Sequence, residues 1–393
     1  MRALFLLTYY EPHWTGLTAY ARRIAEGLAA RGHDVGVLTT RHEASLAPIE
    51  DIRGVRVHRV DPRFTVSRSA IAPGLLLELN RLLANTDVVS IHIPFPEVLP
   101  ATALARLRGA AVFMTHNGDL VLPQGLLKAP LEYGYYTTTY LAGRLATGVV
   151  PQTRDYSASS PLLSRLWPKL HFIYAPVDLP APDPTGVAAQ GRELGLEGKT
   201  VIGFAGRFVE EKGFDFLLEA VPDIVAAVPD AHFLFAGEHH IPYEGFFEAQ
   251  ATLLRAHQDR FTLLGLLKDP QAMANFYGLL DVFALPSRSD CFPSTQIEAV
   301  RSGTPVVVAD IPGAREIVKV TGMGVIVPAM NAAALAQGII EVATNRPRYA
   351  DRHESALATF DPEGTYDAYE ALFLNAIRPP RGAGQAPDSR RAP

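Results

Sequence analysis

The sequence predicts an α/β protein with two parallel sheets in series, and three observations carry this prediction. Short apolar runs rich in β-forming residues alternate with longer segments of helical period along almost the whole chain. The length of 393 residues is sufficient for two or three domains. A segment with four prolines, residues 175–186, interrupts the alternation near the middle of the chain and disfavours both a helix interior and a central strand.

The first half of the chain contains a helix whose position is clear from its pattern. Ala21, Ile24, Ala25 and Leu28 fall on one face between residues 18 and 31, and Gly32 then ends the helix. Strands are expected where the apolar runs lie, at residues 2–7, 34–39, 55–60, 88–91, 111–115 and 148–151.

The second half repeats this alternation. Strands are expected at residues 200–205, 231–236, 261–264, 282–285, 305–308 and 324–327, with helices at 214–228 and 362–377. We therefore predict an N-terminal domain over residues 1–178, a linker over 179–198, a C-terminal domain over 199–361 and a disordered tail over 378–393.

Composition excludes several classes of protein. The chain is 48% hydrophobic and 20% charged, with a net charge of −5, which is typical of a folded soluble protein and gives no reason to expect a nucleic-acid partner. Its one cysteine excludes an intramolecular disulfide and a zinc site of several thiolates. The first apolar run is too short for a secretory signal, and no run is long enough to span a membrane, so a cytoplasmic protein is expected.

The first chemically informative segment follows the strand predicted at 200–205. Gly206 allows close approach of the backbone, Arg207 offers a fork of donors, and Lys212 adds a point charge, which together suit a diphosphate. Taken alone, this pattern is more typical of a basic surface loop.

The second informative segment, residues 286–309, runs from a strand end into a helix. Ser294 or Thr295 is expected to cap that helix, whose free amides favour phosphate. Asp290 and Glu298 would place acceptors for sugar or ribose hydroxyls on either side. The alternatives are a loop turn for Asp290 and a solvated helix position for Glu298, and Cys291 is favoured as a small filler over a nucleophile.

These segments resemble the retaining nucleotide-sugar glycosyltransferases of family 4. Its signature of two acidic residues separated by seven others corresponds to Asp290 and Glu298, followed by Gly-Thr-Pro-Val at 303–306. Asp stands where the family usually has Glu, and Cys291 where it has Gly. Four further landmarks occur in order along the chain, namely a glycine loop at 12–17, a helix end at 31–35, a histidine loop at 114–119 and the linker entry at 174–178.

The resemblance implies the GT-B fold, two Rossmann-like domains facing each other across a cleft. The N-terminal domain would bind the acceptor, the C-terminal domain would bind the nucleotide sugar, and the helix at 362–377 would pack back on the N-terminal domain. The implied reaction is transfer of a sugar to an acceptor hydroxyl with retention of anomeric configuration, and the departing phosphate would help deprotonate the acceptor.

The resemblance also implies roles for individual residues. Arg207 and Lys212 would hold the donor diphosphate, Glu298 the nucleotide ribose, and Asp290 the sugar hydroxyls. His116 would face the donor sugar from the other domain. The remaining donor contacts implied are Gly16 and Gly206 near the phosphates, Cys291, Phe292 and Pro293 at the sugar, and Ser294 and Thr295 at the distal phosphate.

Neither a metal nor a cofactor is expected. The sequence contains no Asp-x-Asp motif, and His239-His240 reads better as a solvated pair than as metal ligands. The donor is expected to be a UDP-sugar, with GDP-mannose next, and the acceptor a polysaccharide or glycolipid intermediate or a small molecule.

Two alternative functions are retained and a third is disfavoured. A nucleotide-sugar epimerase of the same fold and a catalytically degenerate nucleotide-sugar-binding protein are retained. An NAD-dependent oxidoreductase is disfavoured, because the first strand does not lead into Gly-x-Gly-x-x-Gly.

Contact with the acceptor or a membrane is a further hypothesis. Tyr9, Tyr10 and Trp14 either stack on an acceptor or line the cleft mouth. The tyrosine-rich helix expected at 131–145 could contact the inner face of a membrane, but packing in the core is the favoured interpretation. The net charge of +4 over residues 1–180 likewise favours an ordinary solvated surface.

Overall fold

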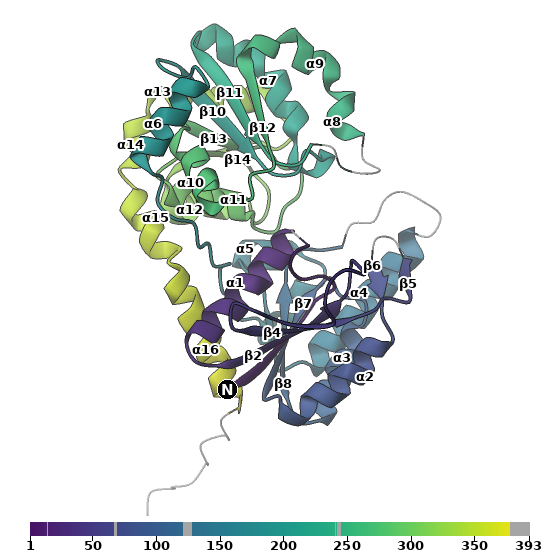
Figure 1. Ribbon diagram of the computed structural model, residues 1–393. Helices are drawn as coiled ribbons and strands as arrows, with labels where there is room; N and C mark the ends of the chain where they lie inside the picture. The colour runs from purple at the N-terminus through teal and green to yellow at the C-terminus, as the bar shows by residue number, and fades with distance from the viewer. Residues whose placement is uncertain (14, 67–68, 121–127, 240, 242–244, 378–393) are drawn as a thin grey trace, which may run out of the picture.

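The computed structural model describes residues 1–13, 15–66, 69–120, 128–239, 241 and 245–377. It contains two parallel sheets, each flanked by helices, one in the lower and one in the upper part of Figure 1. We call the first sheet with its helices the N-terminal domain and the second the C-terminal domain. The predicted tail at 378–393 and Trp14 lie outside the described residues.

The sheet of the N-terminal domain has seven strands in the order β3-β4-β2-β1-β7-β8-β9. All pairings are parallel except that of β3 with β4. The strand bounds are β1 Arg2–Leu6, β2 Asp34–Thr40, β3 Ile49–Ile52, β4 Val55–Val60, β7 Val88–Ile93, β8 Ala111–His116 and β9 Gly148–Val150; a separate hairpin joins β5 Phe64–Val66 and β6 Ser69–Ile71.

The sheet of the C-terminal domain has six parallel strands in the order β12-β11-β10-β13-β14-β15. Its central strands are largely apolar, because helices cover both faces of a parallel sheet. Their bounds are β10 Thr200–Ala205, β11 Ala231–Ala236, β12 Phe261–Gly265, β13 Val282–Leu285, β14 Val306–Ala309 and β15 Gly324–Val327.

Helices connect the strands in both domains. Those before the C-terminal domain are α1 Gly16–Ala30, α2 Gly74–Leu82, α3 Val98–Leu107, α4 Lys128–Leu145, α5 Arg154–Ser159 and α6 Pro184–Glu193. The others are α7 Phe214–Ala227, α8 Phe246–Ala249, α9 Ala251–Ala256, α10 Pro270–Gly278, α11 Ser294–Arg301, α12 Glu316–Thr321, α13 Ala332–Thr344, α14 Arg346–Ala350, α15 His353–Thr359 and α16 Pro362–Ile377. Short 3-10 turns lie at Leu83–Asn85, Leu163–Lys169, Glu210–Lys212 and Gln258–Arg260.

The last helix, α16, crosses from the C-terminal domain back to the N-terminal domain (Figure 1). Its Tyr369 and Phe373 are completely buried in the core formed by one face of the first sheet and α1. The hydroxyls of Tyr369 and Tyr20 lie 2.8 Å apart, so α16 is also fastened by a buried polar contact.

The segment predicted as a linker, residues 179–198, contains the helix α6, which the sequence analysis did not predict. Pro184 stands in its first turn, where a proline costs no hydrogen bond. Asp183 caps the helix, accepting from the amides of Thr185 at 3.2 Å and Gly186 at 2.9 Å. The prolines of this segment therefore position a helix start as well as exclude a helix interior.

The tyrosine-rich helix α4 is only partly a core element. Tyr136 and Tyr140 pack against the core on the face of the first sheet opposite α1 and α16, whereas Tyr133 is 76% exposed and Leu145 49% exposed. Within the described residues, no helix combines the length and apolar character needed to cross a membrane. Contact of α4 with a membrane surface stays a prediction.

Candidate active site

A cavity of about 580 Å³ lies between the two domains, at the carboxyl ends of both parallel sheets. In each sheet, successive strands are added first on one side of the first strand and then on its other side. This reversal lies between β1 and β7 in the first sheet and between β10 and β13 in the second. Ligands of open α/β sheets bind at such switch points. The volume is in the range that holds a small-molecule substrate.

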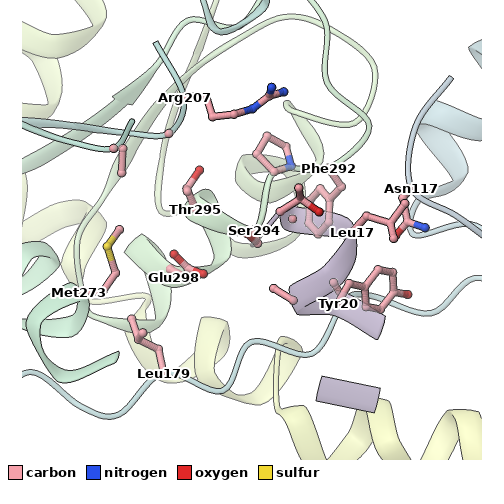
Figure 2. A pocket seen from close by; sticks show the side chains of 18 of the residues that line it. Leu17, Tyr20, Asn117, Leu179, Arg207, Met273, Phe292, Ser294, Thr295 and Glu298 are labelled. Atoms are coloured by element: carbon pink, nitrogen blue, oxygen red, sulfur yellow. The ribbon is translucent and has the colours of Figure 1, made fainter. Parts of the chain in front are cut away.

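The structure brings together on this cavity every predicted site residue except His116. Figure 2 shows Arg207, Thr295 and Glu298 from the C-terminal domain, with Leu17 and Tyr20 of α1 and Asn117 beside them from the N-terminal domain. The predicted residues that line it are Gly16, Gly206, Arg207, Lys212, Asp290, Cys291, Phe292, Pro293, Ser294, Thr295 and Glu298. Their roles toward a ligand stay predictions.

The loop after β10 places two cations on the cavity. Arg207 is exposed at its rim, and Lys212 is half-buried at the end of a short 3-10 turn. The next residue, Gly213, has a φ of +68°, and a Cβ there would lie 2.0 Å from the carbonyl oxygen of Pro286. Only glycine fits this approach, which holds the Lys212 turn against the loop that follows β13.

Lys212 and Asp290 form an ion pair across these two loops. Burial opposes the charge on Lys212, but the neighbouring Asp290 carboxylate outweighs it and raises the pKa of Lys212. The ammonium group therefore keeps its charge while two of its three donors can point elsewhere. Asp290, which is predicted to meet sugar hydroxyls, thus also contacts Lys212.

The start of α11 faces the cavity, but its cap differs from the prediction. Ser294 and Thr295 are the first two residues of the helix, and Pro293 occupies the N-cap position without a side-chain cap. The correction follows from the backbone, since Pro293 has an extended φ and ψ of −66° and 125°. The first amides of a helix have no partner within it, so they and the helix dipole favour an anion here.

Glu298 is not a solvated helix residue, because only 8% of it is exposed. The hydroxyl of Tyr277, which is fully buried, donates to Glu298 Oε2 at 3.0 Å. On the other side, Arg23 of α1 lies 3.6 Å from Glu298 Oε1. One helix of the N-terminal domain thus reaches the carboxylate predicted to bind the nucleotide ribose.

The N-terminal domain contributes mostly uncharged groups to the cavity. Thr15 caps α1, accepting from the Thr18 amide at 3.1 Å, and Gly16 next to it leaves open space, since a Cβ there would meet nothing within 4 Å. Asn117 and Gln152 also line the cavity. Gln152 is 8% exposed, and among the described residues its side-chain oxygen has no hydrogen-bond partner.

Cys291 crosses the cleft rather than serving only as a filler. Its Sγ donates to the backbone oxygen of Asn117 at 3.1 Å, which joins the donor loop, defined as residues 290–293, to the loop after β8. Burial raises the pKa of the Cys291 thiol to about 12. The thiol is therefore protonated at neutral pH, which argues against a nucleophile.

His116 does not line the cavity and is 2% exposed. Its Nε2 lies 3.3 Å from Asp119 Oδ1. Asp119 also accepts from the hydroxyls of Tyr156 at 2.9 Å and Ser160 at 3.0 Å. Burial opposes the charge of Asp119, but the hydrogen bonds from His116, Tyr156 and Ser160 lower its pKa. The predicted contact of His116 with the donor sugar stays a prediction.

The sequence analysis did not predict three polar residues that line the cavity: Arg23, Asn117 and Gln152. Asn117 was within the quoted histidine loop, so its position was a usable signal. Arg23 stands beside Arg22 on a helix, where two arginines are typical of a solvated face. Nothing in the sequence around Gln152 distinguishes it from an ordinary loop amide.

The aromatic residues at the glycine loop behave differently from one another. Tyr10 is 1% exposed and packs in the core, so stacking on an acceptor is wrong for this residue. The Tyr9 ring lies 4.7 Å from that of His13, and His13 lies 5.1 Å from His42.

Within the described residues, no three His, Cys, Asp or Glu side chains gather as a metal site. His240, one of the two adjacent histidines considered as ligands, lies outside the described residues.

Comparison with known proteins identifies the family. Residues 14–179 match the model of Glycosyltransferase Family 4, and residues 199–345 match that of Glycosyl transferases group 1. The D-inositol 3-phosphate glycosyltransferase of Segniliparus rotundus is 32% identical over 356 residues, which cover 80% of this chain and 75% of that protein. The chain belongs to glycosyltransferase family 4.

Other relatives extend over most of this glycosyltransferase. The phosphatidyl-myo-inositol mannosyltransferase of Mycobacterium tuberculosis is 28% identical over 365 residues, covering 88% of this chain and 89% of that protein. The GDP-mannose-dependent alpha-mannosyltransferase of Mycolicibacterium smegmatis is 26% identical over 331 residues, covering 81% and 82%.

Solved structures confirm the fold class. The structure of HepE from Anabaena in complex with UDP and glucose has a TM-score of 0.75 at 18% identity, covering 95% of this chain and 100% of that one. Sucrose-phosphate synthase from Thermosynechococcus elongatus has a TM-score of 0.73 at 19% identity, covering 95% and 99%. The fold is GT-B, two Rossmann-like domains facing each other across a cleft.

Proposed function

We propose that this glycosyltransferase moves a hexose from a nucleoside diphosphate hexose to an acceptor hydroxyl, with retention of anomeric configuration. The observation that carries the proposal is the composition of one wall of the cavity. Arg207, Lys212 and the start of α11 offer positive charge, while buried Glu298 offers a hydroxyl acceptor beside them. A nucleoside diphosphate carries the matching diphosphate charge and ribose hydroxyls.

The proposed reaction balances without a protein nucleophile. The bond from the sugar anomeric carbon to the donor phosphate oxygen breaks, and a bond to the acceptor oxygen forms on the same face. The acceptor proton passes to the departing phosphate oxygen, and a nucleoside diphosphate is released. Arg207, Lys212 and the helix dipole stabilise the charge that develops on that phosphate.

GDP-mannose is the first donor to test, followed by UDP-sugars. The curated relatives at 26% and 28% identity carry names that state mannosyl transfer, and one of these names states dependence on GDP-mannose. The structures determined with UDP share less than 20% identity with this chain, so their likeness supports the fold alone. UDP-sugars, which the sequence alone favoured, become the second class to test.

For the acceptor, we propose a lipid-linked or soluble polyol or sugar. Both relatives named for an inositol acceptor, phosphatidyl-myo-inositol in one and D-inositol 3-phosphate in the other, are consistent with a polyol. The apolar side chains exposed on α4 of the N-terminal domain would suit peripheral contact with a membrane that carries a lipid-linked acceptor.

The test is proton NMR of the transfer reaction with GDP-mannose or UDP-glucose and a panel of inositol and sugar acceptors. We expect one donor class to give a product with the anomeric configuration of the donor, at a rate unchanged by a metal chelator. An inverted product would contradict retention, and loss of activity with the chelator would contradict catalysis without a metal. Epimerised nucleotide sugar with no transfer would favour the epimerase.

A further inference from the structure

The loop that joins β14 to α12, residues 310–315, lies between the donor loop of the C-terminal domain and α5 of the N-terminal domain. Arg315 in this loop donates to both carboxylate oxygens of Asp155, each at 2.7 Å. Asp155 lies in the first turn of α5, at the edge of the N-terminal domain that faces the C-terminal domain (Figure 1). The Gly313 amide also donates to Asp155, at 3.3 Å, and Lys319 Nζ lies 3.7 Å away.

This arrangement is a paired and mostly buried contact. The side chains of Arg315 and Asp155 are 26% and 17% exposed, and two parallel N–H···O bonds fix their relative orientation. The hydrogen bond from Arg315 lowers the pKa of Asp155, so this carboxylate is charged at neutral pH. Arg315 is held from its own side as well, because it donates to Asp310 at 3.0 Å.

On the C-terminal side, the 310–315 loop is packed directly against the donor loop. Gly313 has a φ of +88°, and a Cβ there would lie 2.0 Å from the carbonyl oxygen of Cys291 and 2.9 Å from that of Asp290. The two loops therefore cannot shift past each other freely. A contact that fixes Gly313 also fixes the backbone of Asp290 and Cys291.

On the N-terminal side, the same turn of α5 fixes the loop after β8. Tyr156, next to Asp155, donates to Asp119 at 2.9 Å and accepts from the Asp119 amide at 3.0 Å. Asp119 in turn contacts His116, and this loop also carries the Asn117 oxygen that accepts from Cys291. One helical turn thus contacts the loop after β8 directly and reaches the donor loop through residues 310–315.

We propose that Asp155 and Arg315 are positioning residues for sugar transfer, whose ion pair sets the register of the donor loop against the loop that carries His116 and Asn117. This inference rests on the proposed function, because it assigns a contribution to that same site. Neither residue lines the cavity, so their effect is transmitted through Gly313 on one side and Tyr156 on the other.

The first test is a double-mutant cycle on transfer kinetics in the full-length protein. Asp155→Asn keeps the shape and removes the charge, and Arg315→Gln removes the forked donor. We expect each to lower kcat/KM about tenfold, mainly through kcat, and the double variant to be no slower than either single variant. Affinity for the nucleoside diphosphate should change less than about twofold, because Arg207, Lys212 and the start of α11 all belong to the C-terminal domain.

A second readout does not depend on activity. With the ion pair gone, the two domains should separate more in the ligand-free state, so the radius of gyration from small-angle X-ray scattering should rise in both variants. The matched control is Arg2→Gln, which breaks the ion pair between Arg2 and Asp87. This pair lies at the amino ends of β1 and β7, away from the cleft. Arg2→Gln should change neither the radius of gyration nor the transfer rate.

The outcomes separate this inference from the proposed function. If the wild type transfers sugar and the variants match it, or if the effects of the two substitutions multiply in the double variant, the positioning role is wrong and the function stands. If the wild type transfers no sugar, the proposed function fails, and an unchanged radius of gyration would then overturn the ion pair as an interdomain contact.

Discussion

The two walls of the cleft are built from different chemistry. The C-terminal wall carries eight charged side chains of both signs, among them Arg207, Lys212 and Glu298. The N-terminal wall offers a helix start, the amides Asn117 and Gln152, and fewer charged side chains, of which Arg23 already pairs with Glu298. This difference is what we expect if the C-terminal domain binds the charged donor, as proposed, and the N-terminal domain completes the site through short polar groups.

The largest effect is expected from the helix that crosses between the two domains. Phe373→Ala in α16 empties a completely buried position in the N-terminal core, which should lower the free energy of unfolding by about 3–5 kcal/mol. Denaturant unfolding followed by hydrogen exchange in β8 would measure it. Leu357→Ala in α15, at a position 37% exposed, is the control, and an equal effect there would contradict the tight docking of α16.

The charged wall should depend strongly on Lys212. Lys212→Ala removes the buried ammonium that faces the cavity and leaves Asp290 unpaired, so kcat/KM should fall about a hundredfold, or about 2.7 kcal/mol. Steady-state transfer kinetics would measure it, with Lys199→Ala at the exposed start of β10 as the control. A rate similar to the wild type would remove Lys212 from the site.

Acid should affect the N-terminal domain through His92. Burial lowers the pKa of His92 in β7 to about 3, against an ordinary value of 6.5, so only the unfolded chain binds the proton near pH 5. The free energy of unfolding is therefore unaffected by His92 above about pH 6.5. It decreases as the pH falls below that value, by about 2 kcal/mol at pH 5. His92→Leu should flatten the decrease in denaturant unfolding between pH 7 and pH 5, and an unchanged slope would contradict the burial.

The smallest effect expected is at the residue that the two walls share. Glu298→Gln keeps the shape but removes the charge that Arg23 and a ribose hydroxyl would meet, so nucleotide affinity should fall about tenfold, or about 1.4 kcal/mol. Glu219→Gln, exposed on α7, is the control in calorimetric titrations. A tighter complex would instead show that the carboxylate repels the diphosphate.

Much of the fold could be predicted because the central strands are buried on both faces. Their continuous apolar runs indicate β10 and β11 to the residue, and β7 only extends two residues further, through the buried His92. The antiparallel edge strand β3 was missed because Ile49–Ile52 is mostly exposed and half acidic. The helix α6 was missed because prolines hid a capped start.

The site divides in the same way. Its charged residues lie in two short segments, Arg207 with Lys212 and Asp290 with Glu298. The family pattern and the chemistry of phosphate binding both predict a site at these segments. The contribution of Arg23 depends on how α1 meets α11, more than 270 residues later in the chain, and the contact of Cys291 with Asn117 depends on cleft closure. Such contacts arise from domain packing, and no local pattern encodes them.

The most direct test of the account is a calorimetric titration of the wild type and Glu298→Gln with GDP-mannose and with UDP-glucose. The account expects one donor to bind the wild type and to bind Glu298→Gln about tenfold more weakly, whether or not a chelator is present. Binding of neither nucleotide sugar, or equal binding to both proteins, would contradict a donor site on the charged wall of the cleft.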